Sequence, residues 1–274
     1  MEQRNKPFEE PFHRFPASMS HRDLVKHIEH NSKSSSPRWS CVRETQHSVI
    51  HVDRIKGKNY DGVRTTCNFA VPAPFVLTYF LDPLFRSQWD AAFDYSTIVE
   101  EIDDDTVVWR LVFKSPISLM KPRDAVVRMT TNYSPAAGRY VIEYHSVDHP
   151  SCPPDPRMIR AAVMPGSGAI ITPLDVHGSP SPTLQTTMCQ ATQVEYLDFR
   201  GKTPLWLVGS IAQRLASSFD KFRKVAEQRF SREHAMLSKE GQAEADAANR
   251  SVMATFPAIS PAALGSMTPV SPTP

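Results

Sequence analysis

The sequence predicts an α+β fold in which a curved antiparallel β-sheet is wrapped around a long C-terminal α-helix. Three observations predict it. Strand-like segments follow one another from residue 39 to residue 197, one helical segment interrupts them near residue 75, and a long amphipathic helix ends the series. Because the helix and the strands each present an apolar face, we expect them to pack together and to enclose a cavity.

The chain begins with a lead-in, residues 1–38, that contains one short predicted helix. Ser20 can cap this helix at its start. Leu24, Val25 and Ile28 then recur at the spacing of one helical face. Three histidines in the same segment have no acidic or cysteine partner at ligand spacing, so we interpret them as solvated side chains rather than as metal ligands.

The sheet is predicted to begin at Trp39. Residues 48–56 and 62–71 alternate apolar and polar side chains, as half-buried strands do, and the turn-forming sequence GKNYDG lies between them. Pro72 and Pro74 then open one helix, which is predicted to continue through FVLTYFLDPLFRSQW (75–89). Its apolar side chains are expected to face the core, and they are Phe75, Val76, Tyr79 and Phe80.

Further strand-like segments complete the predicted sheet. They are rich in β-branched and aromatic residues and are separated by turn-forming sequences. In chain order they are residues 95–102, 106–113, 124–133, 139–147, 157–164, 169–174 and 183–197. A proline-rich excursion, residues 148–156, interrupts this order.

The long helix is predicted over residues 203–230. Thr203 can accept hydrogen bonds from its first free N–H groups, and Pro204 is tolerated because its missing N–H would have no helical partner there. Apolar residues then recur at steps of three and four positions, and they are Leu205, Val208, Ile211, Ala212, Leu215, Phe219, Phe222 and Ala226. Residues 231–274 end in a stretch rich in Pro, Ser, Thr and Ala, which predicts a disordered tail.

Composition argues against several classes of protein. A hydrophobic content of 41% with a net charge of +2 does not fit a nucleic-acid-binding protein, which normally carries a strongly basic face. The four cysteines stand far apart, so we expect reduced thiols in the cytoplasm rather than a disulfide framework or a zinc site. The polar N-terminus does not resemble a signal peptide. Apolar runs of four or five residues are too short to span a bilayer, so any membrane contact would be peripheral.

Five motifs carry a family resemblance. They are FRSQWD (85–90), DDTVVW (104–109), KPRDAVVR (121–128), SVDHPSCPPDPRMIRA (146–161) and DFRGKTPLWLV (198–208). With them, residues 39–230 resemble a START domain, of the steroidogenic-acute-regulatory-related lipid-transfer family. The resemblance implies a helix-grip fold whose internal lipid tunnel lies between the sheet and the C-terminal helix. Enclosure has a physical reason, because exposing about 30 lipid methylenes to water costs on the order of 25 kcal/mol.

The resemblance also implies which residues bind the polar end of the lipid. Arg86 and Asp90 match positions that hold choline phosphate in phosphatidylcholine carriers of the family. Arg110 lies in mid-strand, where a charge is costly unless it is paired. It matches a tunnel-facing position that is acidic in sterol-handling members and aromatic in phosphatidylcholine carriers. Met129 stands where sterol-handling members have a paired arginine, and Ala125 replaces an aromatic residue.

These departures favour a glycerophospholipid over a sterol, and a headgroup other than choline, because the aromatic cage for a quaternary ammonium is depleted. An anionic headgroup could then bind Arg86 and Arg110. The structural alternative is a buried ion pair between Arg110 and Asp90. Arg128 is one residue out of phase with Met129 and is expected to point outward.

Two segments are predicted to form the tunnel mouth and to contact a membrane. The first is the loop 115–121, whose Ile117, Leu119 and Met120 are flanked by basic residues and suit insertion among lipid headgroups. A well-packed surface loop is the alternative. The second is the apolar side of the C-terminal helix, which would act as a gate through Trp206, Val208, Ile211 and Leu215. For Trp206, a tryptophan near the start of a long helix, a place in the core is the more common role.

The expected function is binding of one lipid and its transfer between membranes. The protein is expected to be a cytoplasmic monomer that touches membranes transiently, with no cofactor, metal or nucleic-acid partner. One alternative is a lipid sensor that reports its occupancy to another protein. The other is a helix-grip enzyme, such as a thioesterase or cyclase. His145, Asp148, His149 and Ser151 lie close in sequence, but catalytic triads are assembled from distant segments, so we do not expect an enzyme.

Overall fold

The computed structural model describes Lys26 and most of the chain from residue 39 to residue 236. The described ranges are 39–56, 58, 60–115, 117, 120–135, 138–175, 177–181, 186–201, 214 and 217–236. The chain divides into two compact units, Met1–Phe230 and Ser231–Pro274. All strands and labelled helices belong to the first unit, and the described residues of the second, 231–236, are helical.

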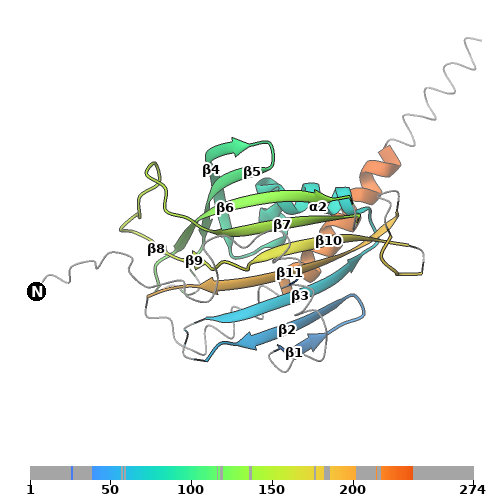
Figure 1. Cartoon of the computed structure of the whole chain (residues 1–274), viewed down its shortest axis with the longest axis horizontal. Coiled ribbons are helices and arrows are strands. Elements are labelled where there is room, and N and C mark those ends of the chain that lie inside the picture. Colours follow the sequence, from blue (N-terminus) through green and yellow to red (C-terminus); the bar gives the residue numbers. More distant parts are fainter. Residues whose placement is uncertain are drawn as a thin grey trace, which may run out of the picture. The chain divides into compact units, whose positions relative to one another are not determined.

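One large, open sheet forms the body of the first unit (Figure 1). In hydrogen-bonded order its strands are β1 (Trp39–Glu44), β2 (Ser48–Arg54), β3 (Asp61–Phe69), β11 (Met188–Asp198), β10 (Gly168–Leu174), β7 (Arg139–Ser146), β6 (Arg123–Ser134), β5 (Thr106–Phe113) and β4 (Phe93–Asp103). These neighbours are antiparallel. Two short strands attach to them: β8 (Ile159–Arg160) is parallel to β6, and β9 (Ala162–Val163) pairs with β11.

The sheet buries apolar side chains on both of its faces. On β6, Ala125 and Val127 belong to the large core that also contains side chains of the C-terminal helix. Val126 lies between them in sequence and packs on the opposite face with Val108 and Cys152. Successive residues of a strand point to opposite faces, so this alternation separates an inner face, toward the helix, from an outer face.

Two short helices follow β3 where the sequence predicts one. They are α2 (Ala73–Leu81) and α3 (Pro83–Trp89). Asp82 is extended, with a ψ of 111°, and its side chain accepts a hydrogen bond from the N–H of Leu84 at 2.8 Å. Pro83 has no N–H to continue the first helix, so the chain turns at this point and starts again. Because of this break, α3 runs in a different direction from α2. Arg86 and Trp89 are residues of α3.

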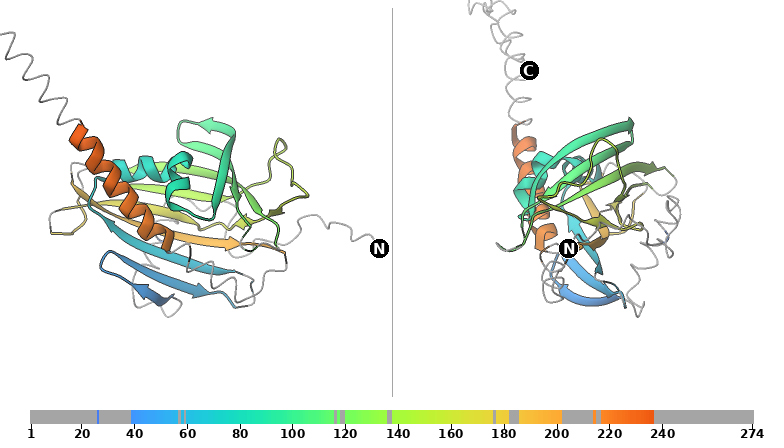
Figure 2. Two further views of the ribbon diagram at one scale, coloured as in Figure 1. Left: turned by 180° about the vertical axis from the view of Figure 1, so that it is seen from behind. Right: turned by 90° about the vertical axis from the view of Figure 1, so that its left-hand side faces the viewer.

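Within the first unit, residues 217–230 of the C-terminal helix cross the inner face of the sheet on the same side as α2 and α3 (Figure 2, left). Phe219, Phe222 and Ala226 are buried and belong to the main core. Polar contacts fix the helix at two places. Ser48 donates to Asp220 at 2.6 Å, and Glu227 accepts from the N–H of Ala70 at 3.0 Å. The predicted fold class, an antiparallel sheet that grips a C-terminal helix, is confirmed.

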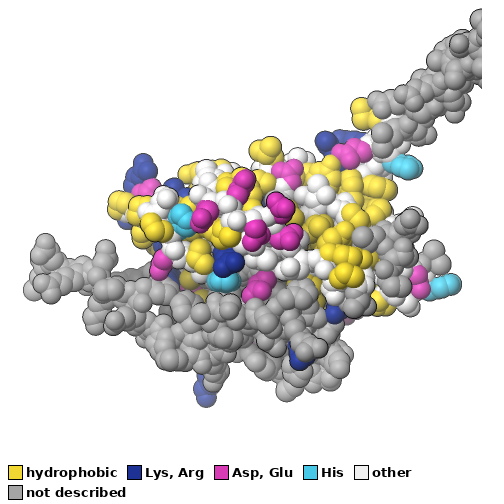
Figure 3. Space-filling model, turned by 45° about the horizontal axis from the view of Figure 1, so that its top comes forward, with side chains coloured by type: hydrophobic (Ala, Val, Ile, Leu, Met, Phe, Trp, Pro, Cys, Tyr) yellow, Lys and Arg dark blue, Asp and Glu magenta, His cyan; other side chains and the backbone are white. Residues whose placement is uncertain are grey.

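The edge of the sheet at β4 is highly charged. This strand has three irregularities in its pairing with β5, and most of its residues are exposed. Figure 3 brings the side of the β4–β5 hairpin forward and shows acidic side chains gathered there among hydrophobic ones. Charges and bulges on an edge strand hinder pairing with another chain, which is consistent with a strand that ends its sheet.

None of the helices among the described residues is both long enough and apolar enough to cross a membrane. The four cysteines, at positions 41, 67, 152 and 189, are free thiols. Burial raises the pKa of the Cys67 thiol to about 12, so this thiol stays protonated at neutral pH.

Candidate functional site

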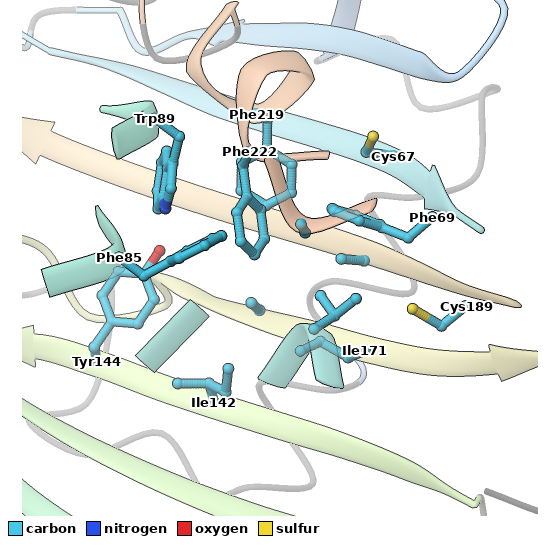
Figure 4. Close-up of a cluster of buried hydrophobic side chains, with 14 of the residues drawn as sticks. Cys67, Phe69, Phe85, Trp89, Ile142, Tyr144, Ile171, Cys189, Phe219 and Phe222 are labelled. Atoms are coloured by element: carbon cyan, nitrogen blue, oxygen red, sulfur yellow. The ribbon is translucent and has the colours of Figure 1, made fainter. Parts of the chain in front are cut away.

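Aromatic side chains fill the middle of the space between the sheet and the C-terminal helix (Figure 4). Phe219 and Phe222 point from the helix toward the sheet. The ring of Phe222 lies 4.9 Å from that of Trp89 and 5.3 Å from that of Phe69, measured between centroids. This part of the domain is therefore a solid core and not a tunnel.

A cavity of about 520 Å³ lies beside this core. Its wall is formed by the end of α3 and the following turn, by β5, β6 and β11, and by the C-terminal helix. Trp89, Phe113, Leu197 and Phe199 contribute apolar surface. A volume in this range is typical of sites that bind small molecules.

A second, smaller cavity of about 40 Å³ extends this space along the inner face of β5 and β6. Trp89, Phe113, Glu195 and Leu197 line both cavities, so the two are neighbours. Met129 lies in the wall of the smaller one. Together the two cavities form a space that is apolar along most of its wall and that has charged groups at α3 and β11.

The first charged group is the pair of Arg86, on α3, and Asp90, the residue that caps the end of this helix. Arg86 donates to one carboxylate oxygen of Asp90 through Nε at 3.0 Å and Nη2 at 2.9 Å. Asp90 is 2% exposed, and its other oxygen accepts from the N–H of Ala92 at 3.1 Å. The Arg86 guanidinium also lies over the rings of Trp89, Phe93 and Phe113, with distances of 5.2 to 5.6 Å to their centroids. These contacts hold Arg86 in one orientation at the cavity wall.

The second charged group is Glu195, on the inner face of β11. Its carboxylate accepts one hydrogen bond, from the Gln193 amide at 3.3 Å, and that amide also donates to the Tyr144 hydroxyl at 2.7 Å. Burial raises the pKa of Glu195 to about 7. Arg86 lowers the pKa of this carboxyl and Asp90 raises it, so the ion pair on α3 has opposing effects on Glu195.

Basic side chains line the larger cavity on its other sides. They come from three separate elements and are Lys114, Arg123, Arg214 and Lys221. Arg123 is 2% exposed and donates to the carbonyl of Lys121 at 2.6 Å, so it also anchors the loop that precedes β6. The cavity therefore presents a cationic lining to a ligand, with Asp90 already paired.

The structure corrects the predicted place of Arg110. Its guanidinium donates to Asp124 at 3.0 Å, and Arg160 binds the same carboxylate at 2.9 Å. Leu111 and Phe113 line the cavity, so Arg110, which alternates with them along β5, faces the outer side of the sheet. The predicted pairing of Arg110 with Asp90 is also wrong, because Asp90 binds Arg86 on its own helix.

The other predicted site residues fall into three groups. Met129 is a cavity residue, whereas Ala125 is fully buried in the main core beside Leu111 of β5. Ile117 is 36% exposed, and its carbonyl accepts from the N–H of Met120 at 3.0 Å, which forms a turn in the loop before β6. The remaining predicted gate residues lie outside the described residues, and they are Leu119, Trp206, Val208, Ile211 and Leu215.

Sequence reasoning missed Glu195, Gln193 and Tyr144. A signal was present in β11, because Gln193 and Glu195 share the alternation phase of Ala191 and Leu197, which are buried on the inner face. Two neighbouring polar residues in that phase indicate a polar patch on an otherwise apolar wall. Among the described residues, no group of three or more His, Cys, Asp or Glu side chains could hold a metal ion.

Comparison with known proteins agrees with this geometry. Residues 23–229 match the family model of the START domain. The chain belongs to the START domain family. Bovine StAR-related lipid transfer protein 5 is 30% identical to it over 136 residues, which cover 49% of this chain and 59% of that protein. The matched region thus spans little more than half the length of this relative.

Solved structures share the fold of this START domain. The crystal structure of human STARD10 superposes with a TM-score of 0.65 at 19% identity, covering 82% of this chain and 87% of that one. Human StAR-related lipid transfer protein 5 gives a TM-score of 0.64 at 19% identity, covering 77% and 95%. The predicted family is confirmed, and membership of this family supports lipid binding in general.

Proposed function

We propose that this START domain binds one glycerophospholipid in the cavity beside the C-terminal helix and transfers it between membranes, without catalysing a reaction. The main observation in support of the proposal is that the larger cavity has both an apolar wall and basic side chains along it. Fatty chains favour the wall, since each methylene removed from water contributes about 0.8 kcal/mol. A phosphate favours the basic side chains, which offer charge-assisted hydrogen bonds.

A sterol fits this lining less well. Its single hydroxyl could satisfy one polar group, whereas Lys114, Arg214 and Lys221 approach the same cavity from two elements. Cations close to a bound apolar ligand lose part of their hydration, and a phosphate compensates that loss whereas a hydroxyl does not. This difference supports a phospholipid rather than a sterol.

The histidine-rich segment near residue 149 supports a role without catalysis. His149 contacts Glu100 through Nε2 at 3.0 Å, and its Nδ1 accepts from the backbone N–H of Ser151 at 3.2 Å. In a triad, the imidazole would instead accept from the serine hydroxyl. This arrangement fixes a loop, and neither cavity is lined by it.

The proposed function is tested by native mass spectrometry of the purified full chain, followed by a transfer assay. We expect one glycerophospholipid per protein, and we expect the protein to move a labelled phospholipid from donor to acceptor vesicles. A co-purified sterol would overturn the choice of ligand. Stable phospholipid binding without transfer would instead favour a sensor.

Membrane contact by the loop before β6 gives a further prediction. Ile117→Asp is expected to reduce phospholipid transfer at least about tenfold, because insertion of an isoleucine contributes roughly 1.5–3 kcal/mol and 1.4 kcal/mol is tenfold. Vesicle co-sedimentation and transfer rates measure the effect. Ile102→Asp, at an isoleucine of β4 that is 44% exposed against 36% for Ile117, is the matched control. Equal rates for the two variants would exclude this loop as the contact.

A further inference from the structure

The cavity contains one carboxylate whose hydrogen-bonding capacity is largely unused. An ionised carboxylate has about four acceptor positions. Glu195 uses one of them, for the 3.3 Å contact with Gln193, and no Lys, Arg or His among the described residues forms an ion pair with it. Because Glu195 lines both cavities, the free positions face the space that a ligand would occupy.

Asp90 differs from Glu195 in this respect. Both oxygens of Asp90 are occupied, by Arg86 and by the N–H of Ala92, and its charge is balanced by the guanidinium. The Gln193 amide is a neutral donor, so Glu195 has no balancing charge at hydrogen-bond distance. Glu195 is half-buried and lines both cavities, so a ligand group that both donates hydrogen bonds and carries a positive charge would match its carboxylate best.

We propose that Glu195 binds a primary ammonium group on the headgroup of the phospholipid, so that this domain selects aminophospholipids. The inference rests on the proposed function, and it names the headgroup chemistry that the same cavity recognises. A primary ammonium supplies three N–H donors to the free acceptor positions of Glu195. A quaternary ammonium has no N–H, and a hydroxyl has no charge, so neither meets both requirements.

Arg86 complements this assignment. Two of its N–H groups bind Asp90, and Nη1 has no hydrogen-bond partner among the described residues. Arg86 of α3 and Glu195 of β11 line the same smaller cavity. A guanidinium N–H suits the phosphate of the same headgroup, so the two residues together match a zwitterion with its phosphate toward α3 and its ammonium toward β11.

The pH dependence of binding follows from the surroundings of Glu195. Among the described residues, several titratable groups face Glu195 or share its cavities. They are Arg86 of α3, Asp90 at its end, Tyr144 of β7, Lys114 after β5, Arg123 of β6, and Arg214 and Lys221 of the C-terminal helix. Burial is the largest cause of its raised pKa of about 7. The carboxyl is therefore about one-tenth ionised at pH 6 and about nine-tenths ionised at pH 8. An alkyl ammonium, with a pKa near ~10, stays charged throughout this window.

The test is equilibrium binding of the full chain to phosphatidylethanolamine and to phosphatidylcholine with the same acyl chains, presented in otherwise identical vesicles. We expect the affinity for phosphatidylethanolamine to rise about tenfold from pH 6 to pH 8, and the affinity for phosphatidylcholine to stay constant within about twofold. Glu195→Gln keeps the shape of the side chain and removes its charge. We expect this variant to lose the pH dependence and about tenfold in affinity for phosphatidylethanolamine at pH 8, with phosphatidylcholine binding unchanged.

Glu143→Gln is the matched control. Burial also raises the pKa of Glu143, but this residue lies on β7 in the phase opposite to Ile142 and Tyr144, outside both cavities. We expect it to bind both lipids as the unmodified protein does. The pH profile of the unmodified protein tests the inference by itself if Glu195→Gln fails to fold.

Three results would overturn the inference. Equal affinities and equal pH profiles for the two lipids would exclude the ammonium contact and leave the proposed function intact. Preserved selectivity in Glu195→Gln would exclude Glu195 as its source. Binding of neither phospholipid by the unmodified protein would overturn both the inference and the proposed function, so the two failures are distinguishable.

Discussion

Replacing Phe222 with alanine is expected to lower the free energy of unfolding by about 3–5 kcal/mol. Phe222 is fully buried, and its ring contacts those of Phe69 on β3, Phe85 and Trp89 on α3, and Phe219 on its own helix. These neighbours are held by a sheet and two helices, so they cannot close over the space that the ring leaves. Denaturant unfolding of the full chain measures the loss.

Lys224→Ala provides the control for this substitution. Lys224 lies on the same helix with its side chain exposed, and alanine is an equally good helix former, so we expect a change within about 0.5 kcal/mol. A loss below about 1 kcal/mol for Phe222→Ala would mean that the helix is not packed on the sheet in solution. The aromatic core would then not fix one wall of the cavity.

Asp124→Asn is expected to destabilise the protein by about 3–5 kcal/mol, because it removes the charge of a fully buried carboxylate that binds two half-buried arginines, only one of which, Arg110, has a second carboxylate nearby, that of Asp155 at 3.9 Å. Asp124 is fully buried and accepts from Arg110 at 3.0 Å and from Arg160 at 2.9 Å. Arg160 also donates to the carbonyl of Pro153 at 3.2 Å. The carboxylate thus ties the proline-rich excursion to the outer face of the sheet.

This substitution also separates a structural role of Arg110 from a role in ligand binding. We expect the variant to unfold at lower denaturant concentration while its co-purified lipid, identified by native mass spectrometry, stays the same. Asp104→Asn, at an exposed position in the β4–β5 turn, is the control and should alter neither property. If Asp124→Asn kept its stability but co-purified with a different lipid, Arg110 would have a role in ligand binding after all.

Arg110 and Glu195, two charged residues within strands, show which features of the site could not be predicted from the sequence. In TVVWRLVF both alternation phases are apolar, so the pattern separates Arg110 from Leu111 and Phe113 but does not say which phase faces the helix. The same holds for Glu195 in β11, where Val194 and Tyr196 are as apolar as the opposite phase. The resemblance assigned Arg110 to the inner phase, and the structure reverses that assignment.

The helix break at Asp82 illustrates the opposite case. An aspartate followed by a proline disfavours a continuous helix, and the sequence carries this signal locally. The prediction of one continuous helix was wrong because it gave the apolar period more weight than the proline. Here the missing information was present in two adjacent residues.

The sequence by itself determined the order of the elements, the fold class and the family, because periodicity, turns and motif spacing are local properties of the chain. The tertiary structure alone decided which face of each strand is inner, how far aromatic side chains fill the space beneath the helix, and which charges meet. Those features depend on contacts between segments far apart in the sequence, such as Phe69 with Phe222 and Ser48 with Asp220. For that reason the structure keeps Arg86 as a candidate site residue, excludes Arg110 from the site, and adds Glu195 to it.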